Sequence, residues 1–208
     1  MMLPYVAIHQ FGLRLHQIRD ADAEVVRQGR NQPFVRERHF YEEIITPEQH
    51  RRWYEGICQT RDYYLVVSKD EIPLGLLYLR DITPHMHTGQ LGIFFWDEKF
   101  LRTRHPMLAI ISFLDFFLMT VGIQNIEGII RKENESMAHI MSFLGFEVFL
   151  NGEKSAQQTR STRMQYAANH HRLIDFARRL KKDPASWDLR IEGEKDARHH
   201  PEMLRVIP

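Results

Sequence analysis

The feature that most constrains the fold is a strand–helix–strand segment in the middle of the chain. An aromatic-rich strand, Gln90–Trp96, runs into a basic loop that opens an almost wholly apolar helix, Pro106–Thr120, which Gly122 closes. The next strand, Asn125–Arg131, alternates apolar and polar residues. Parallel neighbouring strands require a helical crossover of this kind. The segment therefore predicts two parallel strands joined by a buried helix.

The rest of the chain predicts hairpins and short amphipathic helices around this unit. Thr46, Pro47 and Gln49 form a capping-box pattern at a helix start, and Lys69-Asp70-Glu71 is typical of a tight turn between two strands. The other expected elements are a strand from Leu13, a helix N-capped by Asp20 and ending near Gly29, strands Tyr63–Ser68 and Leu74–Asp81, a helix capped by Asn134 and ending at Gly145, and closing strands in "FEVFL" and "STRMQYAA". This order predicts a mixed α/β (α+β) fold with a mostly antiparallel sheet.

Length and composition exclude several classes of protein. With 208 residues, we expect one main domain, 1–168, followed by a C-terminal helix and polar tail, 169–208. The net charge of +1 gives no reason to expect a nucleic-acid partner. The most apolar run, Met107–Ile123, is interrupted by Ser112 and Asp115, so we expect a buried helix and no membrane span.

The cysteine content and the N-terminus indicate a cytoplasmic location. Cys58 is the single cysteine in the sequence, so no intramolecular disulfide can form, and a reducing compartment is expected. We interpret Cys58 as a small apolar residue of a helix. The segment "MMLPYVAIHQFGLRLHQ" lacks the basic start, long apolar stretch and cleavage site of a signal peptide.

Several segments resemble one enzyme family in their order and spacing. They are "LRLHQIRDAD", "RNQPFVR", "TPEQHRRWYE", "YYLVVSKDEIPLGLLYLRDI", "GQLGIFF" and "NESMAHIMSFLGF", and together they cover Leu13–Leu150. In this order the chain resembles the Gcn5-related N-acetyltransferases (GNAT), within them the ribosomal-protein and amino-sugar acetyltransferases. The "RN…VR" and "EQHRRWYE" segments are most similar to enzymes that acetylate a nucleotide-linked 4-amino sugar in pseudaminic-acid synthesis.

The resemblance implies a fold and a place for acetyl-CoA. In the family, the fourth and fifth strands are parallel and splay apart, and the pantetheine arm bonds to strand backbone in the gap. On this chain the resemblance places those strands at Gln90–Trp96 and Asn125–Arg131. It implies cofactor contacts from Ile93, Phe94 and Phe95, from the helix start near Met107, and from Asn134, which begins a helix motif of the family.

The loop before the apolar helix departs from the family pattern. The family's Gln/Arg-x-x-Gly-x-Gly/Ala positions, which carry the pyrophosphate, fall on the residues from Leu101 to Pro106: Leu101, Arg102, Thr103, Arg104, His105 and Pro106. Arginine needs a negative φ and proline has no N–H to donate. Two interpretations follow. Either Arg102, Thr103, Arg104 and His105 bind phosphate by side chain, or the loop is a solvated basic surface.

The expected acid and base are also weakly marked. The tyrosine that often protonates the departing thiolate in the family is replaced by Met141, which has no proton to donate. Glu127 and either His85 or His87 are the candidate bases, since each can accept a proton from an ammonium. For each of them, ordinary surface polarity is the competing interpretation.

We therefore expect an N-acyltransferase that moves an acyl group from a thioester to a primary amine. The donor is acetyl-CoA or, because the loop has lost its diphosphate cradle, an acyl carrier protein. A nucleotide-linked amino sugar is one acceptor that the resemblance implies. The rival hypothesis is a non-catalytic protein that binds a ligand or partner in the same cleft, and a homodimer stays open.

Overall fold

The computed structural model describes residues 6–83, 85, 87–150, 155–180 and 189–193. These residues form a nine-stranded sheet with helices on both faces. The strand order is β7-β8-β6-β5-β4-β3-β2-β1-β9, and every neighbouring pair is antiparallel except β5 and β6. The predicted mixed, mostly antiparallel sheet is confirmed. Within the described chain, no helix is both long and apolar enough to cross a membrane.

Antiparallel hairpins build the first half of the sheet. β1 (Val6–Gln10) turns into β2 (Leu13–Gln17) through Phe11 and Gly12, both of which have positive φ. β3 (Tyr63–Lys69) turns into β4 (Ile72–Arg80) through Asp70 and Glu71, which also have positive φ. Two central residues with positive φ fit the right-handed twist of paired strands. The second turn was expected, whereas β1 and its turn were not.

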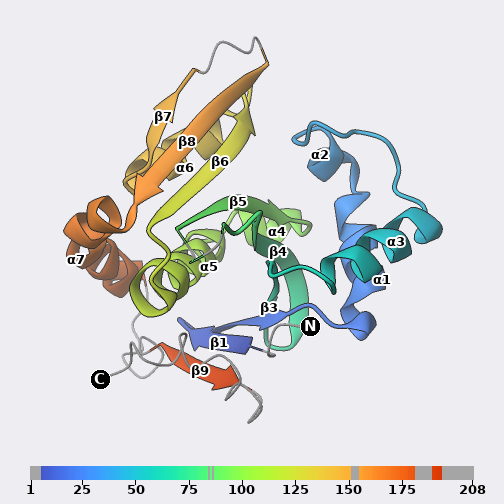
Figure 1. Ribbon diagram of the computed structural model, residues 1–208, viewed down its shortest axis with the longest axis horizontal. Helices are drawn as coiled ribbons and strands as arrows, with labels where there is room; N and C mark the ends of the chain where they lie inside the picture. The colour runs from blue at the N-terminus through green and yellow to red at the C-terminus, as the bar shows by residue number, and fades with distance from the viewer. Residues whose placement is uncertain (1–5, 84, 86, 151–154, 181–188, 194–208) are drawn as a thin grey trace.

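Two apolar clusters lie on opposite faces of this sheet. One face is covered by α1 (Asp20–Arg30), α2 (Pro33–Arg36) and α3 (Pro47–Ile57), with Val26, Val35 and Trp53 packed on Tyr64 and Phe94. The other face carries the main core, beneath α5 (His105–Leu114), α6 (Glu135–Phe143) and α7 (Arg163–Leu180). Figure 1 shows α1, α2 and α3 grouped at one side of the sheet, away from α7.

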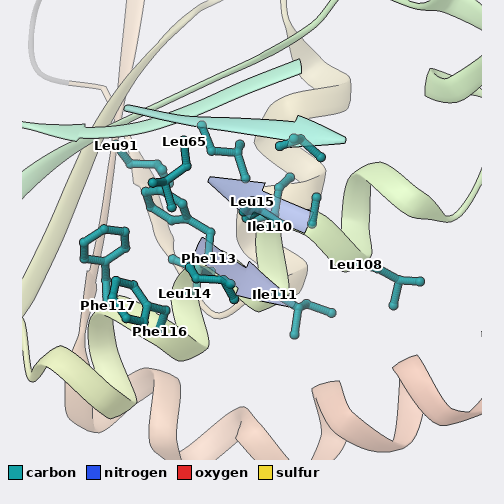
Figure 2. Packing of buried hydrophobic residues seen from close by; sticks show 14 of the residues in the cluster. Leu15, Leu65, Leu91, Leu108, Ile110, Ile111, Phe113, Leu114, Phe116 and Phe117 are labelled. Atoms are coloured by element: carbon teal, nitrogen blue, oxygen red, sulfur yellow. The ribbon is translucent and has the colours of Figure 1, made fainter. Parts of the chain in front are cut away.

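The apolar crossover helix forms the centre of the main core. After α4 (Glu98–Leu101), the helix α5 (His105–Leu114) continues as a π-helical segment, η2 (Asp115–Val121), and ends at Gly122 with φ 88°. Phe113 and Phe117 are fully buried. Figure 2 shows side chains of this helix together with strand residues such as Leu15, Leu65 and Leu91. The buried crossover helix is confirmed, but its second half is wider than the α-helix that was expected.

The crossover brings β5 (Thr88–Phe95) and β6 (Asn125–Arg131) side by side in parallel, as expected. They pair over four positions, from Thr88↔Asn125 to Leu91↔Gly128, and the pairing then stops. β5 stays paired with β4 as far as Phe95, and β6 stays paired with β8 (Ala156–Thr162) as far as Arg131. The two strands therefore diverge towards their C-terminal ends, and Figure 1 shows β6, β7 (Glu147–Phe149) and β8 as an arm leaving β5.

The C-terminal part of the chain differs from the prediction. The expected strand "STRMQYAA" is wrong, because β8 ends at Thr162 and α7 begins at Arg163. Thr162 and Gln165 form reciprocal caps: the Gln165 N–H donates to Thr162 Oγ1 over 3.1 Å, and the Thr162 N–H donates to Gln165 Oε1 over 2.8 Å. This T-x-x-Q capping box starts a helix where strand pairing was expected.

Helix α7 runs through the predicted domain boundary at residue 168. Its residues Tyr166, Leu173 and Ala177 are buried in the same cluster as α5. Part of the expected polar tail is also ordered, since β9 (Arg190–Gly193) adds an edge strand to β1. The remainder of that tail, residues 194–208, lies outside the described residues.

The first helix begins with a different cap from the one expected. Its N-cap is Arg19, and the carboxylate of Asp22 accepts the Arg19 N–H over 2.9 Å and contacts His16 Nε2 over 3.1 Å. Asp20 was predicted as N-cap because it is the first Asp before the helical pattern. Instead Asp20 is the first helical residue, and the side chain of Asp22, at the third helical position, accepts the N–H of the N-cap residue Arg19. The Thr46 cap of α3 and the Asn134 cap of α6 are confirmed.

A buried polar group ties η2 to α7. The carboxylate of Asp115 accepts a hydrogen bond from the Tyr166 hydroxyl over 2.7 Å and contacts His170 Nε2 over 3.0 Å, and Gln10 Nε2 donates to it over 3.4 Å. Because Asp115 is only 5% exposed, these partners offset the cost of removing its carboxylate from water. The hydrogen bond to Asp115 raises the pKa of His170.

Truncating the central aromatic of the crossover helix should destabilise the fold. We expect Phe113→Ala to lower the free energy of unfolding by about 3–5 kcal/mol, because the ring is fully enclosed and its loss leaves a cavity. Urea unfolding measures this, with Met164→Ala as control, since Met164 is 80% exposed. A loss below about 1 kcal/mol for Phe113→Ala would show that the core collapses around the gap.

The His170–Asp115 pair should make stability depend on pH. A group whose pKa is raised on folding stabilises the protein below its unfolded pKa, about 6.5, and loses that contribution as pH rises through the folded value. We therefore expect the stability advantage of wild type over His170→Asn to shrink between about pH 6 and about pH 8.5. Denaturation midpoints at both pH values test this, with the exposed His171→Asn as control. An advantage that grows with pH would contradict the assignment.

Candidate active site

A cavity of about 610 Å³ lies where β5 and β6 diverge. One end is lined by residues of α6, namely Asn134 at its cap, Ser136, Met137, Ile140 and Met141. The other end is lined by α2 and the segment after it: Phe34, Val35, Arg38, His39 and Phe40. The exposed edges of β5 and β6 form the walls between these ends. The cavity thus joins the α6 end to the α2 end through the gap in the sheet.

Tyr78 lines this cavity from β4. Its ring stacks on Tyr64 at 5.2 Å and lies over Gly92 of β5, where an added Cβ would stand 2.2 Å from the Tyr78 hydroxyl oxygen. Only glycine leaves room for the tyrosine at this position. Burial raises the pKa of Tyr78, so its hydroxyl keeps its proton at neutral pH. The hydroxyl is therefore a proton donor beside the point of divergence.

The described cavity wall contains arginines and a histidine but no acidic side chain. Arg38, Arg80 and Arg131 line the cavity, and among its described lining residues none is Asp or Glu. His39 also lines it, with its ring edge against Phe94 at 5.5 Å. Burial, aided by the charge of Arg30, lowers the pKa of His39 to about 4. His39 is therefore neutral near pH 7, and the charged side chains of the described wall are its three arginines.

Arginine side chains hold the segment between α2 and α3 in place beside the cavity. Arg131 of β6 donates to the carbonyl of His39 over 3.0 Å and pairs with Glu42. Arg30 donates to the carbonyl of Tyr41 over 2.7 Å, and Arg36 donates to that of Glu42 over 2.9 Å. These contacts cross from α1 and β6 to the same short segment, so they fix where His39 stands.

The structure brings four of the predicted cofactor-binding residues to the cavity. Ile93, Phe94 and Phe95 line it from β5, and Asn134 lines it from the start of α6. The side-chain oxygen of Asn134 accepts the Met137 N–H over 3.2 Å, so it is also the helix cap. Met107 is not among the lining residues; it is half-buried and packs against the main core. Met141, which stands where the family often has a tyrosine, is buried in the main core.

Of the basic loop, Leu101–Pro106, only Leu101 is among the described residues that line the cavity. Arg102, Thr103 and Arg104 are exposed. The Thr103 hydroxyl accepts the His105 N–H over 3.2 Å, and the His105 ring stacks on Phe100 at 5.7 Å. The His105 N–H is therefore already bonded, and Pro106 has no N–H, so neither residue offers a backbone donor to a phosphate. The side chains of Arg102 and Arg104 have no ion-pair partner within the described chain.

The two predicted bases stand apart from the cavity wall. Glu127 is exposed on β6, and its backbone lies opposite Gln90 of β5 in the parallel ladder. His87 is exposed before β5, and its carbonyl accepts the Asn125 N–H over 2.8 Å. Neither side chain lines the cavity. No cluster of three or more potential metal ligands occurs among the residues that the structure describes.

Sequence reasoning did not find Tyr78, Arg38 or His39. For Tyr78 the available signal was the pair of glycines in "GQLG", because a strand glycine often marks a close approach of a neighbouring side chain. For Arg38 and His39 no signal was available, since a short helix and its exit have no strong periodicity. Their places depend on how the segment after α2 is held over β6.

The comparisons with known proteins agree with this geometry. The model of the Acetyltransferase (GNAT) domain matches residues 12–147. No curated protein sequence matches the chain significantly.

Solved structures with the same fold include three from microbial sources. Spermidine N-acetyltransferase from Vibrio cholerae, in complex with CoA and spermine, is 16% identical, has a TM-score of 0.63, and the match covers 75% of this chain and 98% of that one. A GNAT-family acetyltransferase from Bacillus anthracis is 16% identical with a TM-score of 0.62, over 76% and 99%. A domain from Methanocaldococcus jannaschii is 15% identical with a TM-score of 0.63, over 72% and 97%.

At these identities the solved structures establish the fold alone. The family follows from the domain model, which spans the strands and helices that build the cavity. The chain therefore belongs to the GNAT acetyltransferase family.

Proposed function

We propose that the protein is an N-acyltransferase that moves an acetyl group from acetyl-CoA to a primary amine. One observation carries the proposal: a parallel strand pair, β5 and β6, opens after Leu91↔Gly128 into a cavity that joins two sides of the sheet. A donor and an acceptor can enter such a cavity from opposite ends and meet within it. Holding two reactants in this way makes a large contribution to rate without any particular side chain.

The residues at the gap fit the donor. From Gly92 to Phe95, β5 is paired with β4 along one edge, and its other edge faces the cavity. Backbone groups of Ile93, Phe94 and Phe95 are therefore open to hydrogen bonding by the amide-rich arm of acetyl-CoA. When bound, acetyl-CoA supplies the acetyl group as a thioester that an amine can attack. A backbone N–H on this edge is suited to stabilise the oxyanion that develops.

Tyr78 is our candidate for the proton donor that replaces the tyrosine lost at Met141. Its hydroxyl lies over Gly92 and is protonated at neutral pH. In the reaction the amine loses a proton to solvent and the departing thiolate gains one, which Tyr78 is placed to donate. Glu127 and His87 remain candidate bases that would act through intervening water.

The finer parts of the proposal concern the donor loop and the acceptor. Arg102, Arg104 and His105 would contact the donor phosphates by side chain, because Pro106 and the Thr103–His105 bond leave few backbone donors. An acyl carrier protein is the alternative donor. A nucleotide-linked amino sugar is one candidate acceptor. A non-catalytic binding protein is the rival, and acetyl-CoA turnover with amines separates it from the enzyme.

Removal of the Tyr78 hydroxyl should slow acetyl transfer. We expect Tyr78→Phe to lower kcat by about 100-fold, the lower range for general acid catalysis, while the Kd for acetyl-CoA stays unchanged. Thiol release and calorimetry measure the two quantities. Tyr64→Phe is the matched control, because Tyr64 stacks on Tyr78 but does not line the cavity. An unchanged kcat for Tyr78→Phe would remove Tyr78 from the mechanism.

Removal of a loop guanidinium should weaken donor binding. We expect Arg104→Ala to raise the Kd for CoA by about tenfold to hundredfold, the effect of one lost charge-assisted hydrogen bond. Added salt should weaken wild-type binding as well. Calorimetry measures both, with exposed Arg61→Ala of another loop as control.

The reverse change tests the same loop. Arg104→Gly combined with Pro106→Gly should strengthen CoA binding if the loop lacks only backbone access to the phosphates. Equal CoA binding by wild type and Arg104→Ala would indicate that the loop is an ordinary basic surface.

A further inference from the structure

We place the entry of the acceptor at the α2 end of the cavity, and three arginines line the cavity wall. Arg38 comes from the segment after α2, Arg80 from the end of β4 and Arg131 from β6. Three separate parts of the chain therefore bring a guanidinium to one cavity. Among the described lining residues, the acidic types are missing.

The three arginines differ in how fully they are engaged. Arg131 is paired with Glu42 and Glu133, which places it in the support of the segment after α2. Arg80 donates to Gln90 over 2.7 Å and lies 3.4 Å from the exposed Asp81. Arg38 donates to the carbonyl of Phe34 over 2.6 Å, and no carboxylate of the described chain pairs with it. Arg38 and Arg80 thus keep donors for a ligand.

Two further arginines stand behind this wall. Arg30 Nη1 and Arg36 Nε are buried, and each has no hydrogen-bond partner. Arg30 acts electrostatically on both Tyr78 and His39, which line the cavity, so its charge is felt there. Each guanidinium donates through another nitrogen to a backbone carbonyl, and no carboxylate of the described chain forms an ion pair with either, so their charge adds to that of the wall. These are the arginines of the "RN…VR" segment, which the sequence analysis used for the family resemblance without assigning either residue a role.

The charge distribution discriminates between acceptor amines. A polyamine carries only positive charge, and in a partly enclosed cavity without carboxylates it would be repelled by the guanidiniums. A carboxylate or phosphate matches the planar fork of arginine. We propose, on the basis of the acyltransferase function above, that the acceptor is a primary amine bearing a carboxylate or phosphate group, which Arg38 and Arg80 bind.

The same charges assist the chemistry. The attacking amine must be the neutral free base, and nearby cations favour that form of a bound amine. The acceptor's own anionic group would lie at the arginines, and its amino group further along the cavity, towards Tyr78. Such an arrangement reduces the need for a carboxylate base on the wall, where the described residues provide none.

A panel of matched amines tests the proposal. β-Alanine and propylamine have the same chain length and differ in the terminal carboxylate, O-phosphoethanolamine replaces it with phosphate, and spermidine carries only positive charge. We expect kcat/KM for the better anionic amine to exceed that for propylamine by at least about tenfold, the effect of one charge-assisted contact, with spermidine lowest. The ratio between β-alanine and O-phosphoethanolamine identifies the anion.

Variants connect the preference to the arginines. Arg38→Gln and Arg80→Gln should each raise KM for the preferred anionic amine by about tenfold, and should lower kcat/KM for propylamine by a smaller factor, because propylamine has no anionic group for the guanidinium to bind. Arg51→Gln, an exposed arginine of α3 away from the cavity lining, is the control. Calorimetric binding of each amine in the presence of CoA provides a second readout that does not require turnover.

The outcomes separate this inference from the proposed function. Equal binding and turnover of β-alanine and propylamine, or a preference for spermidine, would overturn the anionic acceptor and leave the acetyltransferase intact. A uniform loss with all amines in Arg38→Gln and Arg80→Gln would also overturn it, since that indicates a structural role. Failure to bind acetyl-CoA at millimolar concentration would instead contradict the proposed function itself.

Discussion

The site depends on the short parallel ladder between β5 and β6. Four residue pairs hold these strands together, and beyond Leu91↔Gly128 each strand stays bonded to its antiparallel neighbour on the other side. The sheet is thus two antiparallel halves joined by a short seam. Side chains of α6 line the opening beyond this seam, so the gap is built into the packing. The buried crossover helix supplies the long connection that this parallel arrangement requires.

The chemical character of the cavity follows from which groups are charged inside it. Arg38 and Arg80 contribute guanidinium groups, whereas burial beside Arg30 lowers the pKa of His39 so that it is neutral at ordinary pH, and burial raises the pKa of Tyr78. The wall therefore has cationic groups, one phenol and open strand backbone. Such a surface is suited to bind an anionic acceptor and to stabilise negative charge that develops on oxygen and sulfur. It is poorly suited to remove a proton directly from an ammonium.

Prediction from the sequence succeeded where the signal was local or strongly periodic. The crossover helix, the parallel pair and the Thr46 and Asn134 caps follow from short patterns of apolar, glycine and capping residues. It failed at β1, where a phenylalanine with positive φ hid the hairpin turn, and at the start of α7, where the Thr162 cap followed directly on strand residues. The π-helical η2 was also missed, because its apolar run is compatible with either helix type.

The sequence by itself determined the family, the crossover and the residues of the basic loop, because these depend on order and spacing along the chain. The tertiary structure determined which side chains share the cavity. Arg38, Arg80 and Tyr78 are brought together by the packing of α2 across the sheet and by the clamp of Arg131 on the segment after it. No spacing in the sequence encodes such a meeting, since it depends on long-range contacts and on the absence of a side chain at Gly92.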